Sequence, residues 1–285
     1  MGEDFIDALS AEDLADYAAS ESITATVSYT QTDEDGNVIN ISEEDAEAAV
    51  ASVGPSPWED MIDFPGDGGG SGLTPVEENE GTYEEEGLGA LGVLKLTFVV
   101  SYWGDDKYHF SVDGEWLTMP KYRGYDSLGA CAQYMSLPGE GDNASGWYSY
   151  ESVELAWGEF QDQTTEKYSI PSSSFGRPTT DGWNGVGATF NLPDDDTSMD
   201  VPLAEFYYSF KVHIGFDIEV ASPDTSWNID PRATYSQHTL GFDYDAGLKI
   251  TASGVDAELG LNVAIMKHNY TIRLTNGLDY VPDGD

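Results

Sequence analysis

The sequence predicts a mainly β fold: an antiparallel β-sandwich or barrel with long meander strands, carrying a small N-terminal α+β appendage. Three observations predict it. Apolar side chains occupy every second position from Phe206 to Val220, the alternation recurs between residues 240 and 274, and a glycine-rich acidic stretch at residues 64–90 sets the first segment apart. A two-residue period is that of a strand with one buried face, and ordinary strands have only about 5–6 residues. We therefore expect long consecutive strands that pair as a meander with one wet face.

The appendage, residues 1–63, has the pattern of a helix, a β-hairpin and a second helix. Residues 23–30 alternate between apolar side chains and Thr or Ser, which is typical of a half-buried strand. Asp35-Gly36 is a turn pair that returns the chain into a second strand over residues 37–42. An isolated hairpin is marginal in water, so this strand is expected to lie against another sheet or helix.

The second helix of the appendage has clear ends. Ser42 and Asp45 form an N-terminal capping pair, and the helix over residues 43–53 stops at Gly54-Pro55. The linker that follows, residues 64–90, combines flexible glycine with acidic residues that repel one another. Such a linker can reach another molecule, so docking on the same body and strand addition to a neighbouring subunit both stay open.

The body, residues 91–285, reads as nearly all β. Residues 91–103 are apolar on both faces, as expected of a central strand buried on both sides. Residues 108–116 alternate, with Tyr108, Phe110 and Val112 on one face. Near the C-terminus the phase of the alternation changes before Tyr270, Ile272 and Leu274, which predicts a bulge at residues 267–269.

The charge of the chain is extreme. The 285 residues include 53 Asp and Glu but only 11 Lys and Arg, giving a formal net charge of −42. Such a charge opposes the compact state at low ionic strength, whereas at 1 M salt the Debye length falls to about 3 Å and the repulsion is screened. The acids run from Glu3 to Asp285 beside a hydrophobic content of 40% and an aromatic content of 12%, which argues against an acidic disordered tail.

In composition the chain resembles the acidic proteins of salt-accumulating haloarchaea, including their surface, secreted and virion proteins. The resemblance extends over the whole chain and identifies no particular family. It implies that the protein comes from a halophile or from one of its viruses and works in high potassium or sodium salt. The charge also argues against binding to nucleic acid or to anionic membranes. The sequence contains no run of 18 apolar residues, so we predict no transmembrane helix.

Candidate sites are few. The densest acidic loop offers oxygen ligands of the kind that calcium or magnesium takes, but its spacing does not match a known calcium loop, and a solvated loop is the preferred interpretation. These acids are Asp194, Asp195, Asp196 and Asp200. Three sequons could carry glycans if the protein is exported. They begin at Asn40, Asn143 and Asn269.

No catalytic constellation is recognisable, and no cofactor is required. Glu151 and Glu154 stand near aromatic residues, but their opposite parity on one strand argues against a glycosidase pair. The four histidines, His109, His213, His238 and His268, are scattered and are expected to be ordinary residues of the wet face. Cys131 stands alone in an apolar run and is expected to be a small core residue.

These features favour a non-enzymatic structural protein of an extracellular assembly, such as a virion tail, turret or spike component or a subunit of a surface filament or matrix. We expect it to act outside the cell, at the cell surface or in a virion, as a homo-oligomer or with other such subunits. The alternatives are a secreted hydrolase, a carbohydrate-binding sandwich module and an outer-membrane barrel. Whether a signal peptide has been removed stays open, because the acidic start lacks a basic region.

The net charge generates a first prediction. Thermal unfolding between about 0.1 and about 4 M KCl should show a melting temperature that rises with salt, because screening relieves repulsion in the compact state. Circular dichroism at the β-sheet minimum is the measurement. A melting temperature that stays flat or falls with salt would contradict the halophilic interpretation.

Overall fold

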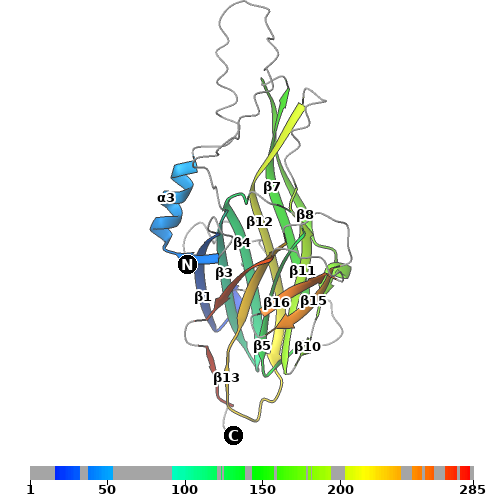
Figure 1. Cartoon of the computed structure of the whole chain (residues 1–285). Helices are drawn as coiled ribbons and strands as arrows, with labels where there is room; N and C mark the ends of the chain where they lie inside the picture. The colour runs from blue at the N-terminus through cyan, green and yellow to red at the C-terminus, as the bar shows by residue number, and fades with distance from the viewer. Residues whose placement is uncertain are drawn as a thin grey trace, which may run out of the picture.

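The structure is a computed structural model that describes residues 17–32, 38–53, 92–120, 123, 125–138, 143–156, 159–177, 179–180, 182–193, 203–238, 246–251, 254–259, 267–274 and 277–282. Two antiparallel sheets pack face to face as a sandwich, confirming the predicted mainly β class (Figure 1). Strands β7, β8 and β12 extend beyond the rest of the sandwich at the top of the view.

The larger sheet has the strand order β2-β1-β3-β4-β12-β7-β8, and β6 pairs with one end of β12. Its strands are β1 (Ser22–Thr32), β2 (Val38–Ile41), β3 (Val93–Gly104), β4 (Lys107–Thr118), β6 (Met135–Ser136), β7 (Ala144–Ala156), β8 (Glu159–Ser169) and β12 (Leu203–Val220). Every pairing within it is antiparallel. The expected central strand is β3, which is buried on both faces.

The smaller sheet has the order β10-β11-β5-β14-β17, with β9 paired to β11, and the described strands also form two separate two-stranded sheets. Its strands are β5 (Tyr125–Gln133), β9 (Phe175–Gly176), β10 (Thr179–Thr180), β11 (Trp183–Asn191), β14 (Arg232–His238) and β17 (Lys267–Arg273). The short pairs join β13 (Trp227–Ile229) to β18 (Leu278–Tyr280) and β15 (Ala246–Thr251) to β16 (Gly254–Leu259). The helical elements described in full are α3 (Glu43–Val53) and η1 (Ser172–Ser174).

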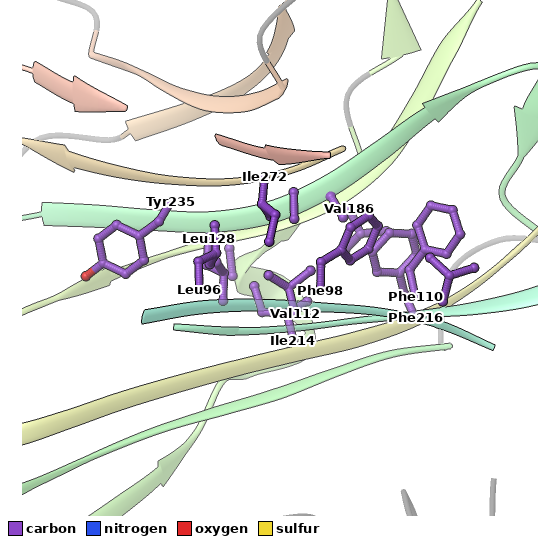
Figure 2. Close-up of a cluster of buried hydrophobic side chains, with 14 of the residues drawn as sticks. Leu96, Phe98, Phe110, Val112, Leu128, Val186, Ile214, Phe216, Tyr235 and Ile272 are labelled. Carbon is purple, nitrogen blue, oxygen red and sulfur yellow. The ribbon is translucent and has the colours of Figure 1, made fainter. Parts of the chain in front are cut away.

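The hydrophobic core fills the space between the two sheets (Figure 2). Because side chains alternate along a strand, each sheet gives one face to the core. The larger sheet contributes Leu96, Phe98, Phe110, Val112, Ile214 and Phe216, and the smaller one Leu128, Val186, Tyr235 and Ile272. The predicted faces of β4 and β17 are therefore confirmed.

The long alternation in β12 is interrupted, which the sequence did not predict. Tyr208 pairs with Glu151 of β7 but Lys211 pairs with Ser149, so two residues of β12 bulge opposite one. Ser209 in this bulge has a φ of 52°. The bulge shifts the phase, so Phe206 leaves the main core and joins a separate cluster with Val153 and Leu155 of β7.

The strands next to β12 also differ from the prediction. The alternating segments were expected to form a consecutive meander. Two of them do pair consecutively, as β15 with β16, but β12 pairs with β4 on one side and β7 on the other. The C-terminal strands β14 and β17 belong to the opposite sheet instead. Apolar alternation shows which face of a strand is buried but not which strand lies beside it.

The N-terminal strand lies in the same sheet as the body. β1 pairs with β3 from Ser22↔Tyr102 to Gln31↔Val93, and β2 returns beside it. The expected helix is α3, whose first turn is capped as predicted: Asp45 N donates to Ser42 Oγ at 3.1 Å. The linker at residues 64–90 lies outside the described residues, so its role as a tether stays a prediction.

The buried face of β1 is the opposite of the one expected. Thr26 is in register with Phe98, a core residue, so the Thr and Ser side chains of β1 face inward. Thr30 is only 3% exposed, whereas Val27 is 47% exposed. The pairing with β3 fixes the face of each residue, since a shift of one residue would reverse it.

A polar network crosses the core between the two sheets. Trp116 Nε1 donates to Tyr235 Oη at 2.9 Å, and Tyr235 in turn donates to Asp126 Oδ2 at 2.5 Å. All three side chains are at most 1% exposed. Burial, with the neighbouring Asp126 carboxylate, raises the pKa of Tyr235 well above its ordinary value. The neutral phenol is thus held as the bridge between the indole and the carboxylate.

Tyr235→Phe should lower the free energy of unfolding by about 1–3 kcal/mol, because it removes a hydrogen-bond partner from two buried polar groups. Tyr134→Phe, at a side chain that is 41% exposed, is the matched control and should change stability by less than about 0.5 kcal/mol. Chemical denaturation in molar salt measures both. Equal stability of the two variants would show that the network contributes nothing.

Candidate functional site

A histidine followed four residues later by an aspartate occurs on each of two neighbouring strands at the centre of the larger sheet. β4 carries His109 and Asp113, and β12 carries His213 and Asp217, with the same spacing in each strand. The antiparallel register pairs His109 with Asp217 and His213 with Asp113. Each histidine therefore lies opposite the carboxylate of the other strand, in an arrangement with local two-fold pseudo-symmetry.

The cross-strand pairs are close and equivalent. His109 Nδ1 lies 2.8 Å from Asp217 Oδ1, and His213 Nδ1 lies 2.8 Å from Asp113 Oδ1. In a neutral imidazole that donates Nδ1–H to a carboxylate, the other nitrogen, Nε2, carries the lone pair. The carboxylates thus fix both the ring orientation and the tautomer, as the outer partners of metal-binding histidines do.

Two tryptophans extend the symmetry outward. Trp103 of β3 stacks on His109 with ring centroids 5.3 Å apart, and Trp147 of β7 stacks on His213 at 5.7 Å. Lys167 of β8 lies over the Trp147 ring, with Nζ 3.8 Å from the centroid. The stacked rings restrict how far either imidazole can turn.

The two imidazoles converge over the middle of the site, which is Gly215. A β-carbon on Gly215 would lie 3.0 Å from His109 Nε2 and 3.5 Å from His213 Nε2. Gly215 is in register with Ser111, whose hydroxyl is buried and makes no hydrogen bond among the described residues. Two ring nitrogens therefore border the space above a glycine, and a buried hydroxyl stands at the paired position on β4.

This cluster, comprising His109, His213, Asp113, Asp217, Ser111 and Gly215, is called the twin His–Asp site. His213 is 2% exposed and His109 is 9% exposed, so the expectation that these two histidines are ordinary wet-face residues is wrong. The carboxylates keep contact with solvent, with 26% of the Asp113 side chain and 35% of the Asp217 side chain exposed. The repeated spacing was visible in the sequence, but its significance depends on a register that the sequence does not state.

The other predicted site residues do not come together. The acidic loop of Asp194, Asp195, Asp196 and Asp200 lies outside the described residues. Glu151 and Glu154 have the opposite parity on β7 that was expected, with Glu151 in register with Tyr208 and Glu154 with Glu205. Within the described part of the chain, no group of three or more His, Cys, Asp or Glu side chains could hold a metal ion.

The sequon residues differ in their surroundings. Asn40 is exposed on β2. Asn143 Nδ2 donates to the carbonyl oxygen of Asp217 at 3.1 Å, so its amide is engaged beside the twin His–Asp site. For Asn269 the backbone lies in β17 and its side chain is outside the described residues.

Cys131 is a core residue, as expected. It is buried on β5, and burial raises the pKa of its thiol to about 12. A thiol with this pKa has almost no thiolate at neutral pH, and the thiolate is the reactive form. Cys131 therefore serves packing.

None of the helices that the structure describes has the length and apolar character needed to cross a membrane.

Comparisons with known proteins add little. No protein-family model matches the chain, and no curated protein matches it. A structure of AvmM, which catalyzes macrocyclization in alchivemycin A biosynthesis, is similar at 8% identity and a TM-score of 0.25, over 60% of this chain and 82% of that one. Clostridium perfringens delta-toxin is similar at 6% identity and a TM-score of 0.21, over 67% and 86%. Neither likeness carries an argument about this chain.

Gly215→Ala tests how tightly the twin His–Asp site is packed. The added methyl group would press on His109, which Asp217 and Trp103 hold in place, so we expect a loss of about 1–3 kcal/mol in the free energy of unfolding. Ser145→Ala, at the exposed position in register with Gly215 on β7, is the control and should be nearly neutral. Unchanged stability of the Gly215 variant would mean that the imidazoles are free to move apart.

Proposed function

We propose that this protein is a non-enzymatic structural subunit of an extracellular assembly of a halophile, joined to its neighbours by β-strand contacts. A virion tail, turret or spike, or a surface filament or matrix, is the setting that fits best. The net charge of −42 supports a role in molar salt. The observation that carries the proposal is the way in which β1 is attached.

The β1–β2–α3 segment contributes little to the core of the sandwich. Within the described residues, every fully buried member of the main core lies between Leu94 and Tyr280, and Val38 of the segment packs against it only partly buried. The segment is held by the backbone ladder between β1 and β3 and by a hydrogen bond of 2.8 Å between Thr32 Oγ1 and Tyr270 Oη, and α3 also contacts β3 and β4. An added edge strand of this kind is a common mode of attachment between protein chains.

The outward face of this segment supports contacts with a neighbour. Val27 of β1 is 47% exposed and Ile39 of β2 is 43% exposed, and they belong to the same face of the sheet. Large apolar side chains on an edge are a liability unless another surface covers them. A subunit packed on this face would remove them from water.

Deleting residues 1–63 tests the proposal. The truncated chain should keep its β-sheet circular dichroism, because the main core is complete without the segment. It should run as a monomer in light scattering at about 3 M KCl, whereas the full chain runs as an oligomer. A truncated chain that keeps the same oligomer would show that the segment is not the connector, and one that unfolds would show that the segment belongs to its own core.

A point variant makes the same test in the full chain. Thr26→Pro places a residue without a backbone N–H in the ladder opposite Phe98 and should release the oligomer as the deletion does. Glu44→Ala, on the exposed side of α3, is the matched control and should leave the oligomer intact.

A carbohydrate-binding module is the second candidate, supported by exposed aromatic rings. Tyr134 is 41% exposed while stacked on Trp227 at 4.2 Å, and Tyr168 is 40% exposed. Flat exposed rings are surfaces on which sugars can pack. Saturable binding of the full chain to a glycan array in molar salt, lost in Tyr134→Ala, would favour this function over assembly.

A further inference from the structure

We propose that the twin His–Asp site binds one divalent transition-metal ion, zinc or copper, between the imidazoles of His109 and His213. The proposal is independent of the assembly role, because the site lies on β4 and β12 rather than on β1. It rests on the orientation of the rings, on the chemistry of the space between them and on the hydroxyl beside them.

The imidazole rings of His109 and His213 have a defined orientation. Both Nδ1 atoms are engaged by carboxylates at 2.8 Å, and both Nε2 atoms lie close to the Cβ position of Gly215. A carboxylate on the far nitrogen of an imidazole is the usual outer partner of a metal-binding histidine, and it raises the basicity of the ligand. Both histidines have this partner, and both are held by a stacked indole.

The space between the rings favours a positively charged occupant. Both Nε2 atoms lie within 3.5 Å of the point where a β-carbon of Gly215 would stand. If both rings are neutral and donate through Nδ1, two lone pairs point into the same small volume and repel each other. A cation between them turns this repulsion into attraction, and imidazole nitrogen is a preferred ligand of zinc and copper.

Ser111 is the third, independent observation. Its hydroxyl is less than 1 Å² exposed and makes no hydrogen bond among the described residues, and Ser111 is in register with Gly215 on the strand that also carries His109. A buried hydroxyl without a partner indicates a missing ligand or water. In this site the metal ion would take two imidazole ligands from the protein, and the Ser111 hydroxyl or water would fill its remaining coordination positions.

Charge supports the choice of a cation. Asp113 and Asp217 flank the site, and the nearest cationic side chain on the same face of β12, Lys211, is engaged by Glu115 at 3.0 Å. Lys167 of β8 is engaged over the ring of Trp147, with Nζ 3.8 Å from the centroid. In a chain with a net charge of −42, the surrounding field attracts cations.

The test uses the full chain, without an affinity tag, freed of metal by a chelator and kept at about 3 M KCl. Titration with Zn²⁺ should show one saturable equivalent by calorimetry and a rise in melting temperature. Cu²⁺ should quench tryptophan fluorescence, because Trp103 and Trp147 stack on the ligands. X-ray absorption of the zinc-loaded wild-type chain should show two imidazoles bound to the metal.

Variants separate this site from adventitious binding. His109→Gln and His213→Gln should each weaken zinc binding at least tenfold, whereas His238→Gln, on β14 of the other sheet, should leave it unchanged. Asp113→Asn and Asp217→Asn should each weaken it roughly tenfold to a hundredfold, as expected of outer partners. The proposal fails if the wild-type chain binds no stoichiometric metal, if absorption shows fewer than two imidazoles, or if His109→Gln binds like the wild type.

Discussion

The antiparallel pairing of β4 with β12 is the interaction on which the rest of the structure depends. On the inner face it aligns Phe110 with Phe216 and Val112 with Ile214, which places four apolar side chains at the centre of the sandwich. On the outer face the same register brings each histidine opposite an aspartate. Because side chains alternate, a slip of one residue would move the histidines into the core and the phenylalanines out of it.

Salt affects the stability of this fold through its charged surface rather than through its core. The core is an ordinary apolar interior between two sheets, and its stabilisation does not require salt in principle. The acidic surface, with 53 acids and 11 basic residues, adds repulsion that only a short Debye length removes. Some of the basic residues are engaged locally, such as Lys211 with Glu115 and Arg232 with Asp230. A solvent-exposed pair such as Lys211–Glu115 contributes little to stability. Screening of the surface charges by salt therefore has the larger effect on stability.

Sequence patterns predicted local structure well and long-range structure poorly. The helix at residues 43–53, its Ser42 cap and the strand buried on both faces were all predictable, because propensity, capping and periodicity act over a few residues. The bulge at Ser209 was not, because alternation on its two sides looks continuous in the sequence. The inward face of β1 was predicted in reverse, since partner register with β3 outweighs the amphipathicity of the strand itself.

The twin His–Asp site illustrates the same limit, and it also bears on function. The two members of each His–Asp pair are 108 and 100 positions apart in the sequence, and they become neighbours only through the β4–β12 register. Stability alone does not explain them, because burying polar or ionic pairs costs desolvation that apolar side chains of similar size would avoid. Neighbouring positions on the same outer face show that apolar residues are accepted there, since Val99 of β3, in register with Ser111, is fully buried. A face that tolerates valine yet holds two oriented imidazoles, two carboxylates, a buried hydroxyl and a glycine is better explained by a ligand than by packing.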